Sequence, residues 1–316
     1  MNRKPSIVFF GSGPVAARSL ELLLENFLVE AVVTKPKPPH HRGEFPVLSI
    51  AKNNNLRIIE VTDKKSTSTA VKNAGFSSEL GVLIDFGIIV SQSVIDSFEK
   101  GIVNSHFSLL PQWRGADPIT FSILSGQEQT GVSLMLLVEA MDEGPLLSVG
   151  IVPLDGTETT PSLTSTLIHL SNSLLAEQVP LYLNGKNTAV SQDDMKGRIA
   201  DYPSEASYSR KLVKSDGILD FSKPAEVLER EVRAYQQWPK SRTTIGNVDV
   251  VVLQTTLGGS ENIRPEGTMY ITEDKQIGIQ TTKGSLIIEK LCPDGKKPMD
   301  TQSFLRGYEN RIRIDT

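Results

Sequence analysis

Three polar residues in the first half of the chain have types and a spacing that suit acyl transfer, namely Asn104, His106 and Asp142. Asn104 and His106 stand two positions apart at the end of an apolar run, so in a strand their side chains share one face. Strand geometry places their Cα atoms roughly 6–7 Å apart, and both groups can then donate to one developing oxyanion. Asp142 stands in a glycine-bearing turn, where its carboxylate could orient a charged imidazole or accept a proton from an attacking amine.

Each of these residues also has a structural interpretation. A single histidine at a strand end is usually structural, Asn104 could cap a turn, and Asp142 could form an Asx turn before Gly144. Of the other three histidines, His169 stands in a leucine-rich helical pattern and is interpreted as structural. The spacing alone therefore leaves both interpretations of the three residues open.

The elements that must position these side chains alternate between apolar runs and helical patterns. Strands are predicted over residues 6–10, 29–34, 57–61, 80–84 and 102–106, and helices over residues 15–25, 46–53 and 90–98. Strands separated by helices indicate βαβ units and a Rossmann-like, mostly parallel sheet of the α/β class. Ligands of such sheets bind beyond the carboxyl ends of the strands, where Asn104 and His106 stand.

The rest of the chain predicts a second domain. A helix after Pro118, strands over 130–138 and 146–152 around the Asp142 turn, and a helix over 163–183 complete the first domain. Residues 186–208 are polar without a clear pattern. A helix over 224–235 and short strands over 243–253, 268–272, 277–281 and 285–291 predict an OB-like β-barrel. The expected division is a catalytic domain over 1–188, a linker over 189–208 and the barrel domain over 209–316.

Composition limits the classes of protein that remain. The 316 residues carry a formal net charge of −4, and the part after residue 190 has 19 basic and 19 acidic residues. A strongly basic domain that would require a nucleic-acid partner is therefore absent. The single cysteine, Cys292, excludes an internal disulfide and fits a reducing compartment. No apolar run approaches the ~20 residues of a membrane span, and the N-terminus does not follow the signal-peptide pattern. We expect a cytoplasmic monomer without a membrane association and without a metal, since no cluster of His, Cys and carboxylates has ligand spacing.

A longer motif surrounds the three polar residues. The run Asn104-x-His106-x-Ser108-Leu109-Leu110-Pro111-x-x-Arg114-Gly115, followed by Asp142-x-Gly144, resembles the formyltransferases that use 10-formyltetrahydrofolate. The turn at 11–17 is similar to the family's opening turn. In the second half, Lys211, Asp220-Phe221, Trp238-Pro239 and residues 294–299 resemble the second domain of the family members that act on methionyl-tRNA.

The resemblance implies a reaction and a role for each residue. The α-amine of methionine on initiator tRNA would attack the formyl carbon, with Asn104 and His106 stabilising the oxyanion. Asp142 would hold His106 charged and help to remove the amine proton. The folate is expected near Phe86, Gly87, Ser108, Leu109, Leu110 and Pro111. Arg42, Gly13 and Pro14 are expected on the tRNA side of the site, and the barrel domain is expected to bind tRNA.

Three positions depart from the family pattern, namely Asp85, Asp117 and Glu143. Asp85 and Asp117 stand where the family usually has small residues, and Glu143 stands where threonine is common. These carboxylates leave the polarity of the folate pocket open. Trp238 is interpreted as a core aromatic at the end of a helix rather than as a base-stacking residue.

Rival functions start from the same residues. Gly11-x-Gly13-x-x-Ala16 after a strand matches a dinucleotide fingerprint and would suit a nicotinamide-dependent oxidoreductase. However, the next strand ends at Lys35 without the acidic residue that binds a ribose hydroxyl. A formyltransferase acting on an amino-sugar nucleotide would share the first domain and the same three residues. A non-catalytic tRNA-binding protein would have no need of them.

Overall fold

The computed structural model describes residues 4–39, 43, 45–259, 264–309 and 312. The chain divides into two compact units. The first comprises Met1–Pro118, Gln129–Pro153 and Thr164–Ser209, and the second comprises Ile119–Glu128, Leu154–Leu163 and Arg210–Thr316.

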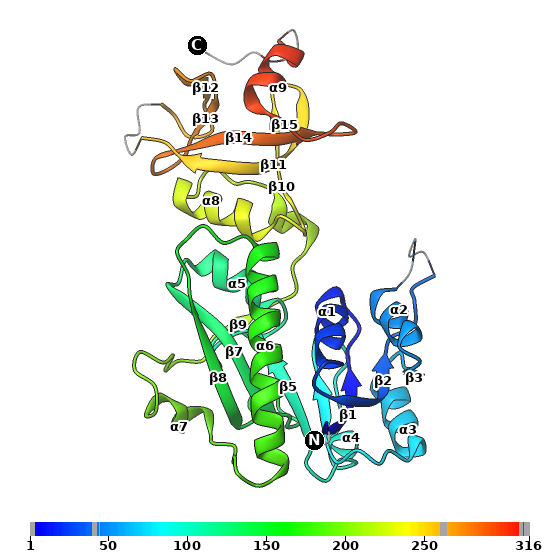
Figure 1. Ribbon diagram of the computed structural model, residues 1–316. Helices are drawn as coiled ribbons and strands as arrows, with labels where there is room; N and C mark the ends of the chain where they lie inside the picture. The colour runs from blue at the N-terminus through cyan, green and yellow to red at the C-terminus, as the bar shows by residue number, and fades with distance from the viewer. Residues whose placement is uncertain (1–3, 40–42, 44, 260–263, 310–311, 313–316) are drawn as a thin grey trace. The chain divides into compact units, whose positions relative to one another are not determined.

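The first unit is built on a seven-stranded sheet with the order β3-β2-β1-β4-β5-β7-β8 (Figure 1). Its strands are β1 (Ser6–Phe10), β2 (Leu28–Thr34), β3 (Arg57–Glu60), β4 (Gly81–Leu83), β5 (Ile102–His106), β7 (Gln129–Leu136) and β8 (Leu146–Pro153). The first five strands in this order are parallel, while β7 and β8 are antiparallel to their neighbours. The strand order reverses between β1 and β4, which is where ligands bind in open α/β sheets. The predicted α/β class is confirmed.

Helices cover the two faces of this sheet. They are α1 (Pro14–Leu23), α2 (Pro46–Asn53), α3 (Lys64–Ala74), α4 (Gln92–Ile95) and most of α6 (Thr160–Leu183). On one face, Val71 of α3 and Val94 of α4 pack in one apolar core with Phe10 and Ile102. On the other face, the Ser105 and Ser171 hydroxyls are 2.7 Å apart, so Ser105 points to α6. Because side chains alternate along a strand, Asn104 and His106 point away from α6.

The segment over residues 190–209 contains regular structure that no apolar pattern indicated. It includes α7 (Gln192–Lys196) and β9 (Tyr208–Ser209), and β9 pairs with β6 (Arg114–Gly115). The Tyr202 hydroxyl donates to the Leu110 carbonyl at 2.6 Å. This segment therefore packs on the part of the chain that follows His106.

The second unit contains an antiparallel sheet, as predicted. The strands are β10 (Ser241–Ile245), β11 (Val248–Leu257), β12 (Met269–Ile271), β13 (Ile277–Gln280), β14 (Ser285–Pro293) and β15 (Met299–Asp300). Their order in the sheet is β10-β11-β14-β13-β12, and β15 pairs with β14. The helices of this unit are α5 (Pro118–Ser125), the 3₁₀ helix η1 (Lys214–Gly217), α8 (Ala225–Ala234) and α9 (Thr301–Tyr308). The strand region predicted over 243–253 is a hairpin of β10 and β11, which turns at Gly246 with φ +59°. Leu228 and Val232 of α8 and Phe304 of α9 close the core of the sheet.

Several local predictions were wrong or incomplete. The helix predicted over 90–98 is limited to α4, and α3 was missed because its residues are mostly polar. The α3 N-terminus is instead marked by a capping box between Asp63 and Ser66. Trp238 is not a core residue, since 53% of it is exposed. No helix among the described residues is long and apolar enough to cross a membrane.

Candidate functional site

Strand β5 carries the two predicted oxyanion donors at its carboxyl end. It pairs with β4 in parallel, with Leu83 opposite Asn104, and with β7 in antiparallel register, with Ser133 opposite His106. Asn104 is 8% exposed and His106 is 7% exposed. Both side chains are thus held inside a packed sheet, which limits their rotation and sets their direction before any ligand binds.

His106 lies between two acceptors. Its Nε2 is 3.0 Å from the Trp113 carbonyl oxygen, and its Nδ1 is 3.8 Å from Asp142 Oδ1. A carbonyl and a carboxylate accept but do not donate, so an imidazolium with a proton on each nitrogen matches both partners. The distance of 3.8 Å is too long for a hydrogen bond but short enough for an ion pair. Nδ1 is therefore the ring nitrogen left to meet a ligand.

The turn that carries Asp142 has a conformation that its neighbours specify. Asp142 adopts φ +53°, and its Oδ2 accepts a 2.7 Å hydrogen bond from the Gly115 backbone N–H. A Cβ on Gly144 would lie 1.8 Å from the Leu136 carbonyl oxygen, and one on Gly115 would lie 2.6 Å from the Ser209 carbonyl oxygen. Only glycine fits at these two positions, which explains why glycine follows Arg114 and stands two residues after Asp142.

The predicted folate segments have mainly structural contacts. The Ser108 hydroxyl donates to the Gln112 carbonyl at 2.5 Å, and the Leu110 N–H donates to the Ser133 hydroxyl at 3.0 Å. The side chains of Ser108, Leu109, Leu110, Pro111 and Phe86 are buried, whereas Gly87 is exposed with φ +65°. A ligand would meet these segments mostly at their backbone, and their part in folate binding stays a prediction.

Asp85 occupies the N-terminus of α1. Its carboxylate accepts hydrogen bonds from the Ala16 and Val15 N–H groups, and a Cβ on Gly13 would lie 1.8 Å from Asp85 Oδ2. The side chain reaches solvent, yet desolvation by the surrounding protein raises the pKa of this carboxyl to about 6, while those hydrogen bonds and Lys35 oppose the rise. A dinucleotide fingerprint would need its pyrophosphate at this helix end. Asp85 fills the end with a carboxylate, which disfavours the oxidoreductase.

The other predicted positions have varied surroundings. Pro14 is the first residue of α1, with Gly13 as its N-cap. Glu143 pairs with Arg114 through a 3.0 Å contact, so this departure from the family pattern has a partner in the protein. Asp117 lies near enough to Asp85 to raise the pKa of Asp85 further. Arg42 lies outside the described residues.

Two residues near the turn were not predicted as site residues. Arg114 and the buried Gln192 both contact the segment over residues 142–144. Gln192 belongs to α7, in the segment predicted as a linker. A capping signal was available there, because the Ser191 hydroxyl accepts from the Asp194 N–H at the start of α7.

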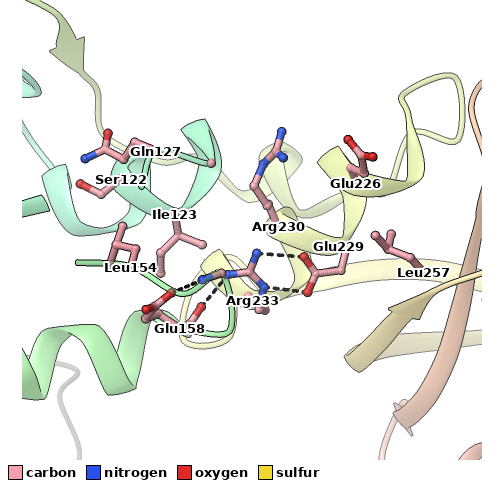
Figure 2. Close-up of a pocket in the computed structure, with 12 residues that line it drawn as sticks. Ser122, Ile123, Gln127, Leu154, Glu158, Glu226, Glu229, Arg230, Arg233 and Leu257 are labelled. Carbon is pink, nitrogen blue, oxygen red and sulfur yellow. Dashed lines mark hydrogen bonds and ion pairs between the residues drawn. The ribbon is translucent and has the colours of Figure 1, made fainter. Parts of the chain in front are cut away.

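A cavity of about 200 Å³ lies in the second unit (Figure 2). Arg233 on its wall pairs with both carboxylate oxygens of Glu229 and donates to the Glu158 carbonyl. The Arg230 Nε donates to the Leu124 carbonyl. The two arginines thus join α8 to the segments over 119–128 and 154–163, and the cavity contains none of the three predicted catalytic residues.

Comparison with known proteins shows the family of this chain. Residues 6–179 match the family model described as formyl transferase, and residues 211–309 match the formyl transferase C-terminal domain. The chain belongs to the formyl transferase family. It is 33% identical over 311 residues to the methionyl-tRNA formyltransferase of Myxococcus xanthus, with 97% of this chain and 96% of the relative covered. It is 32% identical to the methionyl-tRNA formyltransferase of Roseiflexus castenholzii, with 95% of each chain covered.

Solved structures support the fold. The N-formyltransferase from Helicobacter canadensis, crystallised with folinic acid and dTDP-3-aminofucose, aligns with a TM-score of 0.66. The alignment covers 90% of this chain and 98% of that chain at 18% sequence identity. At this identity the likeness shows a shared fold and leaves the acceptor to be argued separately.

Proposed function

We propose that this enzyme transfers a formyl group from 10-formyltetrahydrofolate to the α-amine of initiator methionyl-tRNA, as a methionyl-tRNA formyltransferase. The observation that carries the chemistry is His106, held between the Trp113 carbonyl and the Asp142 carboxylate beside Asn104. The acceptor is supported by the relatives of that name, which match over nearly the whole chain in both units.

The reaction follows from what each group can donate or accept. The amine nitrogen attacks the formyl carbon, and the carbonyl oxygen takes up the negative charge. The Asn104 amide and the His106 Nδ1–H are the two donors for this oxyanion, and preorganised donors of this kind lower the barrier without reorganisation. The attacking nitrogen loses one proton, N10 of the folate gains one, and the bond between N10 and the formyl carbon breaks. Asp142 stabilises the imidazolium and accepts the amine proton in transit.

Substrate binding is assigned to the rim of this site. The folate meets the backbone near Gly87 and the buried segment Ser108–Pro111, and Gly13, Pro14 and Arg42 are the residues proposed to contact the tRNA end. The expected limits, 1–188 for catalysis and 209–316 for the tRNA-binding domain, belong to the same proposal. The enzyme is expected in the cytoplasm, as the sequence predicted.

A direct assay tests the acceptor. The purified chain is incubated with 10-formyltetrahydrofolate and either initiator methionyl-tRNA or a dTDP-amino sugar, and the formylated product is measured by mass spectrometry. We expect formylmethionyl-tRNA and no formylated sugar. Formylation of the sugar nucleotide alone would contradict the proposed acceptor, and formylation of neither would contradict the proposed function.

A further inference from the structure

Gln192 is a buried amide in direct contact with the turn that carries Asp142. Its side chain is 7% exposed, and its Nε2 donates to the Asp142 carbonyl at 2.8 Å and to the Gly144 carbonyl at 3.0 Å. A primary amide has two N–H donors, so both are used on carbonyls that flank Glu143. These two bonds hold the 142–143 and 144–145 peptide groups, which lie on either side of Glu143 and Gly144.

The acceptor side of the same amide is also occupied. Arg114 Nη2 donates to Gln192 Oε1 at 2.8 Å, while Arg114 Nη1 pairs with Glu143 Oε1 at 3.0 Å. The next residue, Gly115, donates its N–H to Asp142 Oδ2. The turn is thus held at its backbone by Gln192 and at two of its side chains by the segment over residues 114–115.

These contacts act on a conformation that needs support. Asp142 has φ +53°, a region that residues with a side chain adopt at a cost. Rotation of the peptide groups at 142–144 would move the Asp142 carboxylate away from His106 Nδ1. Gln192 opposes that rotation because both carbonyl bonds would break together.

We propose that Gln192 is a positioning residue for catalysis, which fixes the Asp142 turn so that the carboxylate faces His106. The role rests on the proposed formyl transfer, in which Asp142 acts on the amine proton and on the imidazolium. It also means that α7, which lies in the segment that the sequence predicted to be a linker, contributes to the chemistry of the first unit.

Two substitutions separate this role from general stability. Gln192→Met keeps the length of the side chain and removes every donor and acceptor. Gln192→Glu keeps the shape of the side chain and an acceptor for Arg114, but its carboxylate cannot donate to the two carbonyls. Circular dichroism and the melting temperature of each variant show that it is folded before its kinetics are compared. Gln178→Met is the matched control, because the Gln178 Oε1 accepts from the Asn187 amide at 2.8 Å, away from the turn.

The test measures kcat and KM for formyl transfer across pH, together with hydrogen–deuterium exchange of residues 137–145. We expect kcat to fall roughly 10- to 100-fold in both Gln192 variants, as for a misplaced catalytic group, with a displaced pH profile and faster exchange in the turn. Gln178→Met should leave all three unchanged. A kcat within twofold of wild type in Gln192→Glu would overturn the inference. The Gln192 variants could show faster exchange in the turn while the wild type transfers no formyl group. That result would refute the proposed function and leave Gln192 as a residue that holds the turn.

Discussion

The two units each contain a cluster of charged side chains, and the clusters differ in how completely their groups are paired. In the second unit, Arg233 donates from Nε and Nη2 to the Glu229 carboxylate and from Nη1 to the Glu158 carbonyl, at 2.6–2.9 Å. In the first unit, His106 has one nitrogen bonded at 3.0 Å and the other 3.8 Å from its carboxylate. The first arrangement leaves little for a ligand, while the second leaves a donor available.

How completely a polar side chain is paired distinguishes a structural role from a catalytic role better than its residue type does. Arg233 and Glu229 could have been taken for a binding site, because they line a cavity (Figure 2). Their geometry is instead that of a bidentate ion pair within α8, whose arginine also donates to the Glu158 carbonyl of another segment. We expect loss of the His106 cluster to lower the rate of the reaction, and loss of the Arg233 cluster to lower the stability of the fold.

The largest effect is expected at His106. His106→Ala removes an oxyanion donor and the cationic partner of Asp142, so kcat should fall by roughly 10²–10⁴-fold. Circular dichroism and melting temperature report whether the variant is folded. The exposed His169 of α6 supplies the control, and His169→Ala should retain wild-type kinetics. Activity of a folded His106→Ala protein within a few-fold of wild type would remove His106 from the mechanism.

An intermediate effect, on stability alone, is expected at Arg233. Arg233→Met leaves Glu229 and the Glu158 carbonyl without a charged donor, which costs about 1–3 kcal/mol when such groups are buried. We expect the melting temperature to fall by several degrees and kcat at low temperature to stay within twofold of wild type. Arg18→Met, at the exposed ion pair with Glu21 on α1, is the control and should change little. A large fall in kcat with an unchanged melting temperature would contradict the structural role.

The smallest effect is expected at Asp85 and depends on pH. The pKa of this carboxyl is raised from 3.8 to about 6 in the folded protein, mainly by desolvation. The folded protein therefore binds this proton more tightly than the unfolded chain does. The resulting contribution to the free energy of unfolding is present below pH 3.8 and is lost as the pH rises through about 6. Asp85→Asn stays neutral, so its melting temperature relative to wild type should rise between pH 5 and pH 7.5. A difference that is constant across this range would show that Asp85 titrates normally.

Much of the first unit was predictable because its strands are buried and short. The apolar runs at 6–10 and 102–106 identified β1 and β5, and their carboxyl ends placed Gly13 and His106 at one edge of the sheet. The alternation of side chains along β5 correctly separated Asn104 and His106 from Ser105, which meets Ser171 of α6.

Other features could not be predicted because tertiary contacts determine them. Gln192 stands in a polar segment whose role depends on carbonyls some 50 positions earlier in the chain, and no local pattern reports such a pairing. The acceptor for His106 Nε2 is a backbone carbonyl, which has no side-chain signature in a sequence. Trp238 was misplaced because an aromatic residue after a helix resembles a core residue whether or not the chain turns it outward.

One measurement tests the central claim most directly, namely single-turnover formyl transfer by wild type and by Asp142→Asn. The two proteins would be mixed with 10-formyltetrahydrofolate and limiting initiator methionyl-tRNA, and formylmethionyl-tRNA would be followed in time. Asparagine keeps the shape of Asp142 but loses its charge, so the rate constant for transfer should fall by at least about 100-fold while tRNA binding persists. An equal rate constant in the two proteins would contradict the assignment of His106 and Asp142 as the pair that drives the reaction.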